Sequence, residues 1–220
     1  MAEFLLILPI LLLSVVAHEY AHAWTAYRQG DTTAYMLGRL TFNPIPHIDP
    51  FMSIIVPVGL WLLSKGAFTF GAAKPVPVNP RNYRNYRRGD IIVSSAGIVM
   101  NLLIALLSAG VFVLLGLAGQ AIPDADWLGT LQRMASIGIS LNVLLAVFNL
   151  VPLPPLDGSH VFYHLLPPAL GARYRAIGRY GFAVLMLTLW LVPGAWNVIL
   201  WPVARITEAA THALAPWTLP

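Results

Sequence analysis

The chain contains no cysteine, and only 10% of its 220 residues are charged. Without cysteine there are no disulfides and no thiolate ligands, so a bound metal must be held by histidine and carboxylate side chains. With few charges and 58% hydrophobic residues, a soluble domain of this size is excluded, because its core could not hide so much apolar surface. The mean hydropathy of +0.71 indicates instead a protein that crosses the lipid bilayer several times.

Long apolar runs alternate with short polar connectors along the chain. The runs cover about 4–27, 51–63, 91–122, 137–152 and 182–206. A helix needs about 20 apolar residues to cross a bilayer, and the second run is too short for that. We therefore predict an all-α polytopic membrane protein with one domain over residues 1–220. Its three-helix core is expected at about 4–27, 90–120 and 135–157, with peripheral membrane segments at about 50–64 and 181–207.

Proline marks two departures from regular helices. Pro75, Val76, Pro77 and Val78 alternate within residues 68–78, a pattern that forbids a helix and predicts a small extended or β segment. Pro193-Gly194 interrupts the last apolar run, which is therefore either one kinked span or a pair of helices.

The basic residues predict how the spans are oriented. Positive charge gathers before the third apolar run and after the first and fourth runs, and such connectors face the cytoplasm. We expect a multi-pass protein of the cell membrane with its N-terminus outside. Residues 51–80 must then cross an even number of times or re-enter. The net charge of +4 reports this topology, so no nucleic-acid partner is expected, and nothing in the sequence predicts an oligomeric state.

The pattern His18-Glu19-Tyr-Ala-His22 lies at the end of the first apolar run. Residues four apart share one face of a helix, so His18 and His22 can offer two imidazole nitrogens to one metal, with Glu19 beside them. Ionisable side chains at membrane depth are costly unless a partner compensates them, and a divalent cation is such a partner. The alternative is a helix end whose polar residues are hydrated in the headgroup region.

A second polar motif, Asn149-Leu-Val-Pro-Leu-Pro-Pro-Leu-Asp157-Gly158, follows the fourth apolar run. The predicted topology places this motif and the histidine pair at the same side of the membrane. Asp157 is then a natural third ligand, because catalytic zinc usually takes three protein ligands and keeps one position open. The prolines end the helix and free backbone groups, which membranes tolerate only in protein-lined or wet cavities.

HExxH in one transmembrane helix, paired with NxxPxxxLDG in a later one, resembles the site-2 protease family of intramembrane zinc metalloproteases, peptidase family M50. The resemblance is greatest to its compact bacterial subgroup without a PDZ domain and covers roughly residues 14–160. It includes Arg39-Leu-Thr-Phe-Asn-Pro44, His47-Ile-Asp-Pro50 and Ala73-Lys-Pro-Val-Pro-Val-Asn-Pro80. The family's usual Gly-Pro pair appears here as Gly97-Ile98, a departure expected to alter local helix geometry and not chemistry.

The resemblance implies one zinc ion per chain, held by His18, His22 and Asp157. It also implies that Glu19 is the general base toward zinc-bound water and that Asn149 donates a hydrogen bond to the developing oxyanion.

The expected substrate is a transmembrane helix of another protein, cleaved within or next to its membrane segment. Such a helix must unwind before hydrolysis, and an unpaired strand edge would offer its backbone new partners. We assign this substrate-binding role to Phe70, Pro75, Val76 and Pro77.

Other polar residues allow alternative ligand sets. His160 and His164 are also four apart and could form a second imidazole pair, or they lie half-hydrated on a short interfacial helix. His47 and Asp49 belong to a connector near the same face, where a structural polar cluster is the simpler interpretation. Asn101, deep in a span, either bonds across helices or touches the site.

Two other classes of function fit parts of the pattern. A zinc-binding membrane protein without turnover, either a transporter or an inactive scaffold, would need neither Glu19 nor a substrate cleft, and a transporter should show more than one ionisable relay. A hydrolase acting on lipid or on small peptides would use the same ligands.

Overall fold

The computed structural model describes residues 2–63, 74–122 and 125–219, and all regular secondary structure in these ranges is helical. The helices are α1 (Ala2–Gln29), α2 (Thr33–Met36), α3 (Val56–Leu63), α4 (Tyr86–Ala121), α5 (Trp127–Leu150), α6 (Asp157–Tyr163), α7 (Pro168–Ile177), α8 (Gly181–Leu191) and α9 (Ala195–Leu214). The prediction of an all-α polytopic membrane protein is confirmed.

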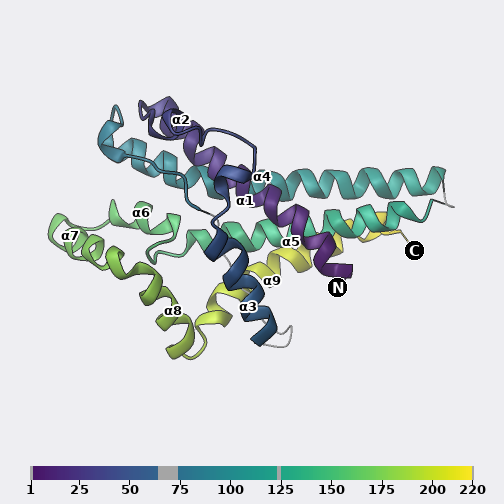
Figure 1. Ribbon diagram of the computed structural model, residues 1–220. Helices are drawn as coiled ribbons and strands as arrows, with labels where there is room; N and C mark the ends of the chain where they lie inside the picture. Colours follow the sequence, from purple (N-terminus) through teal and green to yellow (C-terminus); the bar gives the residue numbers. More distant parts are fainter. Residues whose placement is uncertain (1, 64–73, 123–124, 220) are drawn as a thin grey trace.

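Three helices form the centre of the molecule. Helices α4 and α5 lie antiparallel along their length, and α1 packs across the first half of α4 (Figure 1). The segments Leu5–Gln29, Tyr86–Ala121 and Trp127–Leu150 are long and apolar enough to cross a membrane. Leucines on α4 such as Leu106 and Leu114 are 70% and 66% exposed, which suits contact with lipid chains.

Helix α5 begins at Trp127, earlier than the core segment predicted at 135–157. Its first turns contain polar residues that lower the local hydropathy, yet one of them is buried. Gln132 is only 4% exposed, and its side chain bonds the backbone of the C-terminal residues, donating to the Trp217 carbonyl and accepting from the Leu219 N–H. The helix therefore begins before the apolar run that predicts it, because a buried polar residue with hydrogen-bond partners lowers the mean hydropathy without ending the helix.

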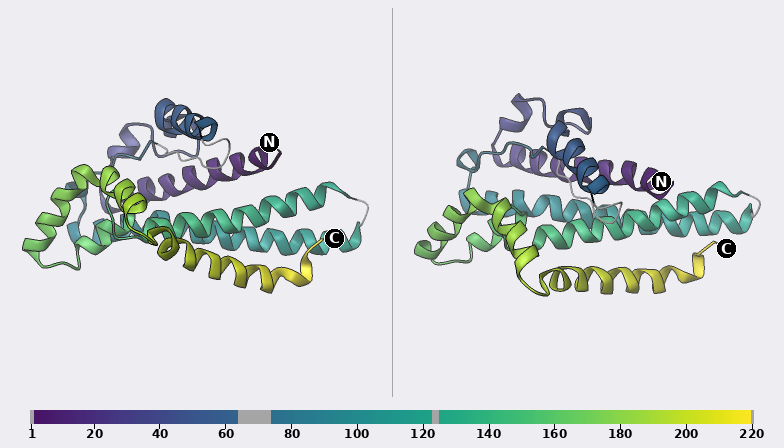
Figure 2. Two further views of the ribbon diagram at one scale, coloured as in Figure 1. Left: turned by 90° about the horizontal axis from the view of Figure 1, so that it is seen from below. Right: turned by 60° about the horizontal axis from the view of Figure 1, so that its bottom comes forward.

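The last apolar run is a pair of helices. Gly194 adopts a left-handed conformation with φ of +82°, which glycine reaches without strain, and the chain bends there by 88°. After the bend, α9 runs along α5 toward the turn between α4 and α5 (Figure 2). Of the two predicted arrangements, a kinked span or a helix pair, the structure has the second.

The connector between α1 and α4 contains the segments expected near the membrane surface. A π-helix over Pro50–Ile55 leads into α3, which at eight residues is too short to cross a bilayer. Residues 64–73 lie outside the described residues, and with them Phe70 and the first part of the predicted segment 68–78. Residues 74–79 form no regular secondary structure, and no β-ladder is present in the described ranges.

Candidate metal centre

His18 and His22 of α1 converge with Asp157, the first residue of α6, and their ligand atoms all lie within 4.8 Å of one another. Helix α6 packs against α4, at the end of the molecule where α1 ends and α4 begins (Figure 1). The Nε2 atoms of the two histidines are 3.0 Å apart, and each lies 3.3 Å from Oδ2 of Asp157. Ligands about 2.0 to 2.1 Å from a tetrahedral zinc ion are about 3.3 Å from one another. The three atoms therefore form one face of a tetrahedron of the size that zinc requires.

The outer nitrogen of each imidazole ring has a partner on α4. Nδ1 of His22 lies 2.7 Å from the Val93 carbonyl oxygen, and Nδ1 of His18 lies 3.1 Å from Oδ1 of Asn101. A carbonyl oxygen only accepts hydrogen bonds, so Nδ1 of His22 carries the proton, and the same tautomer suits His18. Both Nε2 lone pairs then point at each other and at the carboxylate, an arrangement that a cation stabilises.

The Asp157 carboxylate is suited to bind that cation. Oδ2 is buried, and no hydrogen bond within the described residues satisfies it. A charged, buried oxygen without a hydrogen-bond donor is what a metal ligand provides.

Two glycines allow the helices to approach this closely. A Cβ atom on Gly97 of α4 would lie 2.5 Å from His22 Nε2 and 2.6 Å from His18 Nδ1, so only glycine leaves room for both rings. A Cβ atom on Gly158 would collide with backbone at the end of α5, including the Val151 carbonyl at 2.9 Å. Gly158 therefore allows the first turn of α6 to pack against the end of α5 and to carry Asp157 to the histidines.

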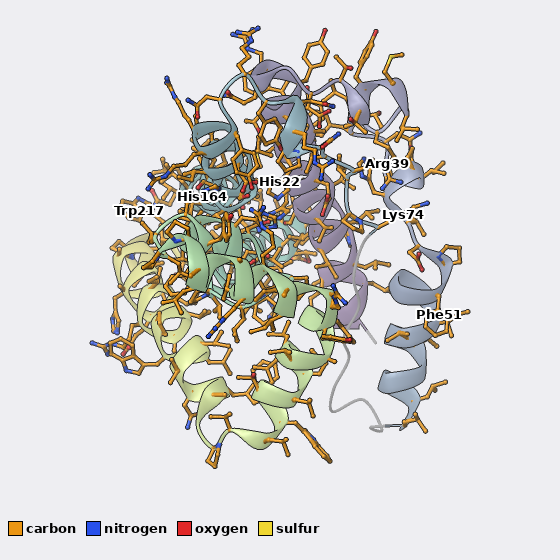
Figure 3. The ribbon with its side chains drawn as sticks, turned by 90° about the vertical axis from the view of Figure 1, so that its left-hand side faces the viewer. His22, Arg39, Phe51, Lys74, His164 and Trp217 are labelled. Carbon is orange, nitrogen blue, oxygen red and sulfur yellow. The ribbon has the colours of Figure 1, made fainter. Side chains whose placement is uncertain are left out.

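Glu19 faces the polypeptide segment that precedes α4. Its Oε2 atom accepts a hydrogen bond of 2.7 Å from the backbone N–H of Val76. Arg39 donates to the carbonyls of Lys74 and Pro75, and Figure 3 shows Arg39 and Lys74 together on one side of the molecule. The segment expected to bind substrate is thus in contact with the expected general base.

The assignment of Pro75, Val76 and Pro77 to substrate binding stays a prediction, as does that of Phe70, which is outside the described residues. Several backbone groups of the segment already have partners within the chain. The Lys74 N–H donates to the His47 carbonyl, and the Val76 N–H is used by Glu19. Within the described residues, the carbonyls of Val76 and Pro77 have no hydrogen-bond partner.

Asn149 lies in the last turn of α5, and its role in stabilising an oxyanion stays a prediction. Its side-chain Nδ2 donates to the Leu145 carbonyl of the same helix at 3.0 Å. One of its two amide hydrogens is therefore already bonded, and the other is left to bond a substrate.

The alternative ligands lie elsewhere. His164 Nε2 is 2.7 Å from Oδ2 of the buried Asp90, and His160 Nδ1 is 3.4 Å from Oδ1 of the same carboxylate. These contacts attach α6 to α4, and within the described residues only His18, His22 and Asp157 form a group that could hold a metal. His47 is buried, with Nε2 3.1 Å from the Thr41 carbonyl, and Asp49 accepts from the Phe51 N–H. Within the described residues, neither belongs to the group that could hold a metal.

For Asn101 the sequence predicts either a bond across helices or contact with the site. The structure shows both, because its bond from α4 to α1 ends on the ring of His18. The sequence does not predict that the Val93 carbonyl bonds the ring of His22, because every residue has a backbone carbonyl and no sequence pattern marks the one that is used. The sequence also contains no signal for the hydrogen bonds of Arg39, which it shows only as the first residue of the family-like segment 39–44.

Comparison with known proteins agrees with this geometry. The family model described as peptidase family M50 matches residues 6–126 and 115–191. The chain is 41% identical over 192 residues to "Putative zinc metalloprotease YwhC" of Bacillus subtilis, an alignment that covers 87% of this chain and 82% of that protein. It is 32% identical over 186 residues to "Putative zinc metalloprotease Rip2" of Mycolicibacterium smegmatis, covering 84% and 67%. No solved structure matches the chain.

Proposed function

Because the chain belongs to peptidase family M50, and is therefore a multi-pass zinc metalloprotease, we propose that it cleaves peptide bonds within or next to the transmembrane segments of other membrane proteins. One observation carries the proposal. His18 and His22 lie within the apolar segment Leu5–Gln29, itself long enough to cross a membrane, and not on an appended soluble domain. A substrate bond that reaches them must enter the membrane region or its immediate border.

The residues divide the chemistry among them. Zinc, when bound to His18, His22 and Asp157, polarises a carbonyl and makes water a better acid. Glu19 accepts the proton of the attacking water and passes it to the amine that leaves. The second amide hydrogen of Asn149 bonds the oxygen on which negative charge develops. The N–H of Val76 holds the Glu19 carboxylate in place while these transfers occur.

We further propose that the site opens toward the cytoplasm from the cell membrane. The site lies at the end of the molecule where α1 ends and α4 begins, and these elements carry Arg28, Arg87 and Arg88 there. Arg173 and Arg175 on α7 lie at the same end. Arginine and lysine gather on the cytoplasmic side of membrane proteins, which supports this orientation.

The test is cleavage of a defined membrane peptide by the full chain reconstituted in vesicles. The peptide has one apolar span with a central Asn-Gly pair that lowers its helix propensity, and a fluorophore at one end. A matched soluble peptide carries the same Asn-Gly pair without the apolar span. We expect cleavage of the membrane peptide only, and we expect Glu19→Gln to abolish it while keeping one zinc ion per chain.

The alternatives give different outcomes. Faster cleavage of the soluble peptide, or release of fatty acid from the vesicles without peptide cleavage, would contradict the proposal and favour a hydrolase of peptides or lipids. Equal behaviour of the wild type and Glu19→Gln in every assay would mean that the chain binds zinc without turnover.

A further inference from the structure

The side chain of Arg39 is buried deeply enough, at 8% exposure, that its contacts are with protein and not with water. It donates three hydrogen bonds to backbone carbonyls. Its Nη2 atom donates to the Lys74 carbonyl at 2.9 Å and to the Pro75 carbonyl at 3.0 Å, and its Nη1 atom donates to the Pro46 carbonyl. A buried guanidinium bonded in this way joins two segments that are far apart in the sequence, and its planar shape fixes their relative position.

Arg39 joins the loop that contains Pro46 to residues 74–75, and a second contact holds that loop in place. His47 is 2% exposed, its ring bonds the Thr41 carbonyl, and its own carbonyl accepts the Lys74 N–H at 2.9 Å. Lys74 is therefore held through both its N–H and its carbonyl. The backbone of residues 74–75 has a fixed position relative to the end of α1 because of these bonds.

Val76 comes next and is the point of contact with the site. Pro75 and Pro77 have no backbone N–H, so Val76 carries the only such donor between them. That donor lies 2.7 Å from Oε2 of Glu19, and the Val76 side chain is buried against Ala23 and Ala34. Val76 is therefore the one residue of 75–77 that can donate a backbone hydrogen bond, and it donates this bond to Glu19.

We propose that Arg39 is a positioning residue for Glu19, acting through the backbone N–H of Val76. The proposal rests on the proposed function in so far as Glu19 is the general base. Glutamate has three rotatable side-chain bonds, and a base must be held within a fraction of an ångström of its working position. Within the described residues, the hydrogen bonds of Arg39 go to the carbonyls of Pro46, Lys74 and Pro75, and none of these is a candidate metal ligand. Arg39 holds residues 74–75 so that the next amide fixes the carboxylate.

The structural link is tested without any substrate. Site-resolved hydrogen exchange of the full chain in detergent measures the backbone amides of Lys74, Val76 and Val78. We expect the Val76 amide to exchange slowly in the wild type. In Glu19→Ala and in Arg39→Ala it should exchange at least about 10-fold faster than in the wild type, because both changes free the N–H donor. Glu19→Gln is the matched control, since its amide oxygen still accepts and the protection should remain.

The functional consequence is measured with the fluorescent membrane peptide. Arg39→Ala should lower kcat by about 10- to 100-fold, with KM within about 2-fold and one zinc ion retained. Arg39→Lys should recover part of the loss, because an ammonium group can still bond a carbonyl.

A proline substitution tests the same link independently, in case the arginine variants lose activity because they fail to fold. Val76→Pro removes the donor itself within a stretch that already alternates with proline, and it should lower kcat like Arg39→Ala. Val78→Pro is its control. Among the described residues the Val78 N–H has no partner, so this variant should retain kcat within about 3-fold.

Unchanged exchange of the Val76 amide in Glu19→Ala, or a normal kcat in Val76→Pro, would overturn the proposal. A wild type that cleaves nothing would refute the proposed function alone, because the exchange experiment would still decide whether Arg39 holds Glu19 in place.

Discussion

Nδ1 of His18 lies 3.1 Å from Oδ1 of Asn101, across the interface between α1 and α4. Asn101 is fully buried, and within the described residues its Nδ2 atom has no hydrogen-bond partner. One imidazole ring of the candidate metal centre is therefore oriented by a helix other than its own. Partners of this kind fix the tautomer of a metal-binding histidine and raise its basicity, so the packing of α1 on α4 and the affinity for zinc are coupled.

Substitution Asn101→Ala should weaken zinc binding by about 10- to 100-fold, because His18 loses the partner that orients its ring. Competition with a fluorescent zinc chelator measures the change. Asn142→Ala is the control, since Asn142 is equally buried and bonds Ser14 across α5 and α1 without touching a metal ligand. That variant should lose thermal stability and keep its zinc affinity. Equal zinc affinity in both variants would contradict the coupling.

Replacing Gly97 by alanine should prevent zinc binding. The added methyl group would occupy the space of both imidazole rings, which cannot move without leaving the metal. Zinc content of the purified variant, measured by mass spectrometry, should fall well below one ion per chain. Gly110→Ala lies on the same helix. Apart from Gly110, its chain neighbours and the nearby backbone of that helix, no atom of the described residues lies within 4 Å of the new Cβ, so this variant should retain zinc and a normal Tm. Full zinc content in Gly97→Ala would mean that the rings lie elsewhere.

Asp157→Ala tests whether the two distant motifs make one metal centre. It removes the third ligand and should reduce zinc content to a small fraction, while the two histidines alone bind weakly. His160→Ala serves as the comparison, because His160 belongs to the alternative pair, is half exposed and contacts Asp90 instead. Its zinc content should equal that of the wild type. Zinc loss in His160→Ala together with retention in Asp157→Ala would reverse the assignment of the third ligand.

Asp31 should make the stability of the fold depend on pH. Burial raises the pKa of Asp31. Hydrogen bonds from the Asn79 N–H, Thr33 and Asn82 lower this pKa by a larger amount, so the net shift is downward. Its unfolded pKa is about 3.9. Since the folded pKa is lower, the charged form stabilises the fold fully above pH of about 4, and this contribution is lost as the pH falls through the folded pKa.

Asp31→Asn should therefore be less stable than the wild type at pH 7, by about 1 to 3 kcal/mol, and the difference should narrow below pH of about 4. Thermal unfolding in detergent from pH 7 to pH 3 measures both effects. Asp126→Asn is the control, because Asp126 is exposed and makes no capping hydrogen bond. If the difference in stability between the wild type and Asp31→Asn stayed constant from pH 7 to pH 3, the charge of the Asp31 carboxylate would contribute nothing to the stability of the fold.

Much of the architecture follows from local sequence patterns. Long apolar runs predict helices that cross a membrane, and the spacing of His18 and His22 places both rings on one helix face whatever the rest of the chain does. The prolines after Asn149 predict where α5 ends, because proline cannot donate the backbone hydrogen bond that would continue it. Asp157 as third ligand needed only the expectation that two helix ends lie on the same side of the membrane.

Other features depend on how helices rotate and cross, and no local pattern contains that information. The bend at Gly194 of 88° and the burial of Gln132 against the C-terminal residues follow from packing. His160 and His164 have the same spacing as His18 and His22, yet they face Asp90 because α6 meets α4 on that side. Spacing predicts which side chains share a face, and it does not predict what that face meets.

The sequence by itself determined the class of protein through its hydropathy, and its family through the motifs that match. The period of a helix also placed the imidazoles of His18 and His22 on one face with Glu19 beside them, as candidates for the metal site. The tertiary structure alone decided that the Val93 carbonyl and Asn101 orient the rings, and that Val76 holds Glu19. These partners are backbone groups or residues far away along the chain. Their identity is set only when α1, α4 and the segment before α4 pack together.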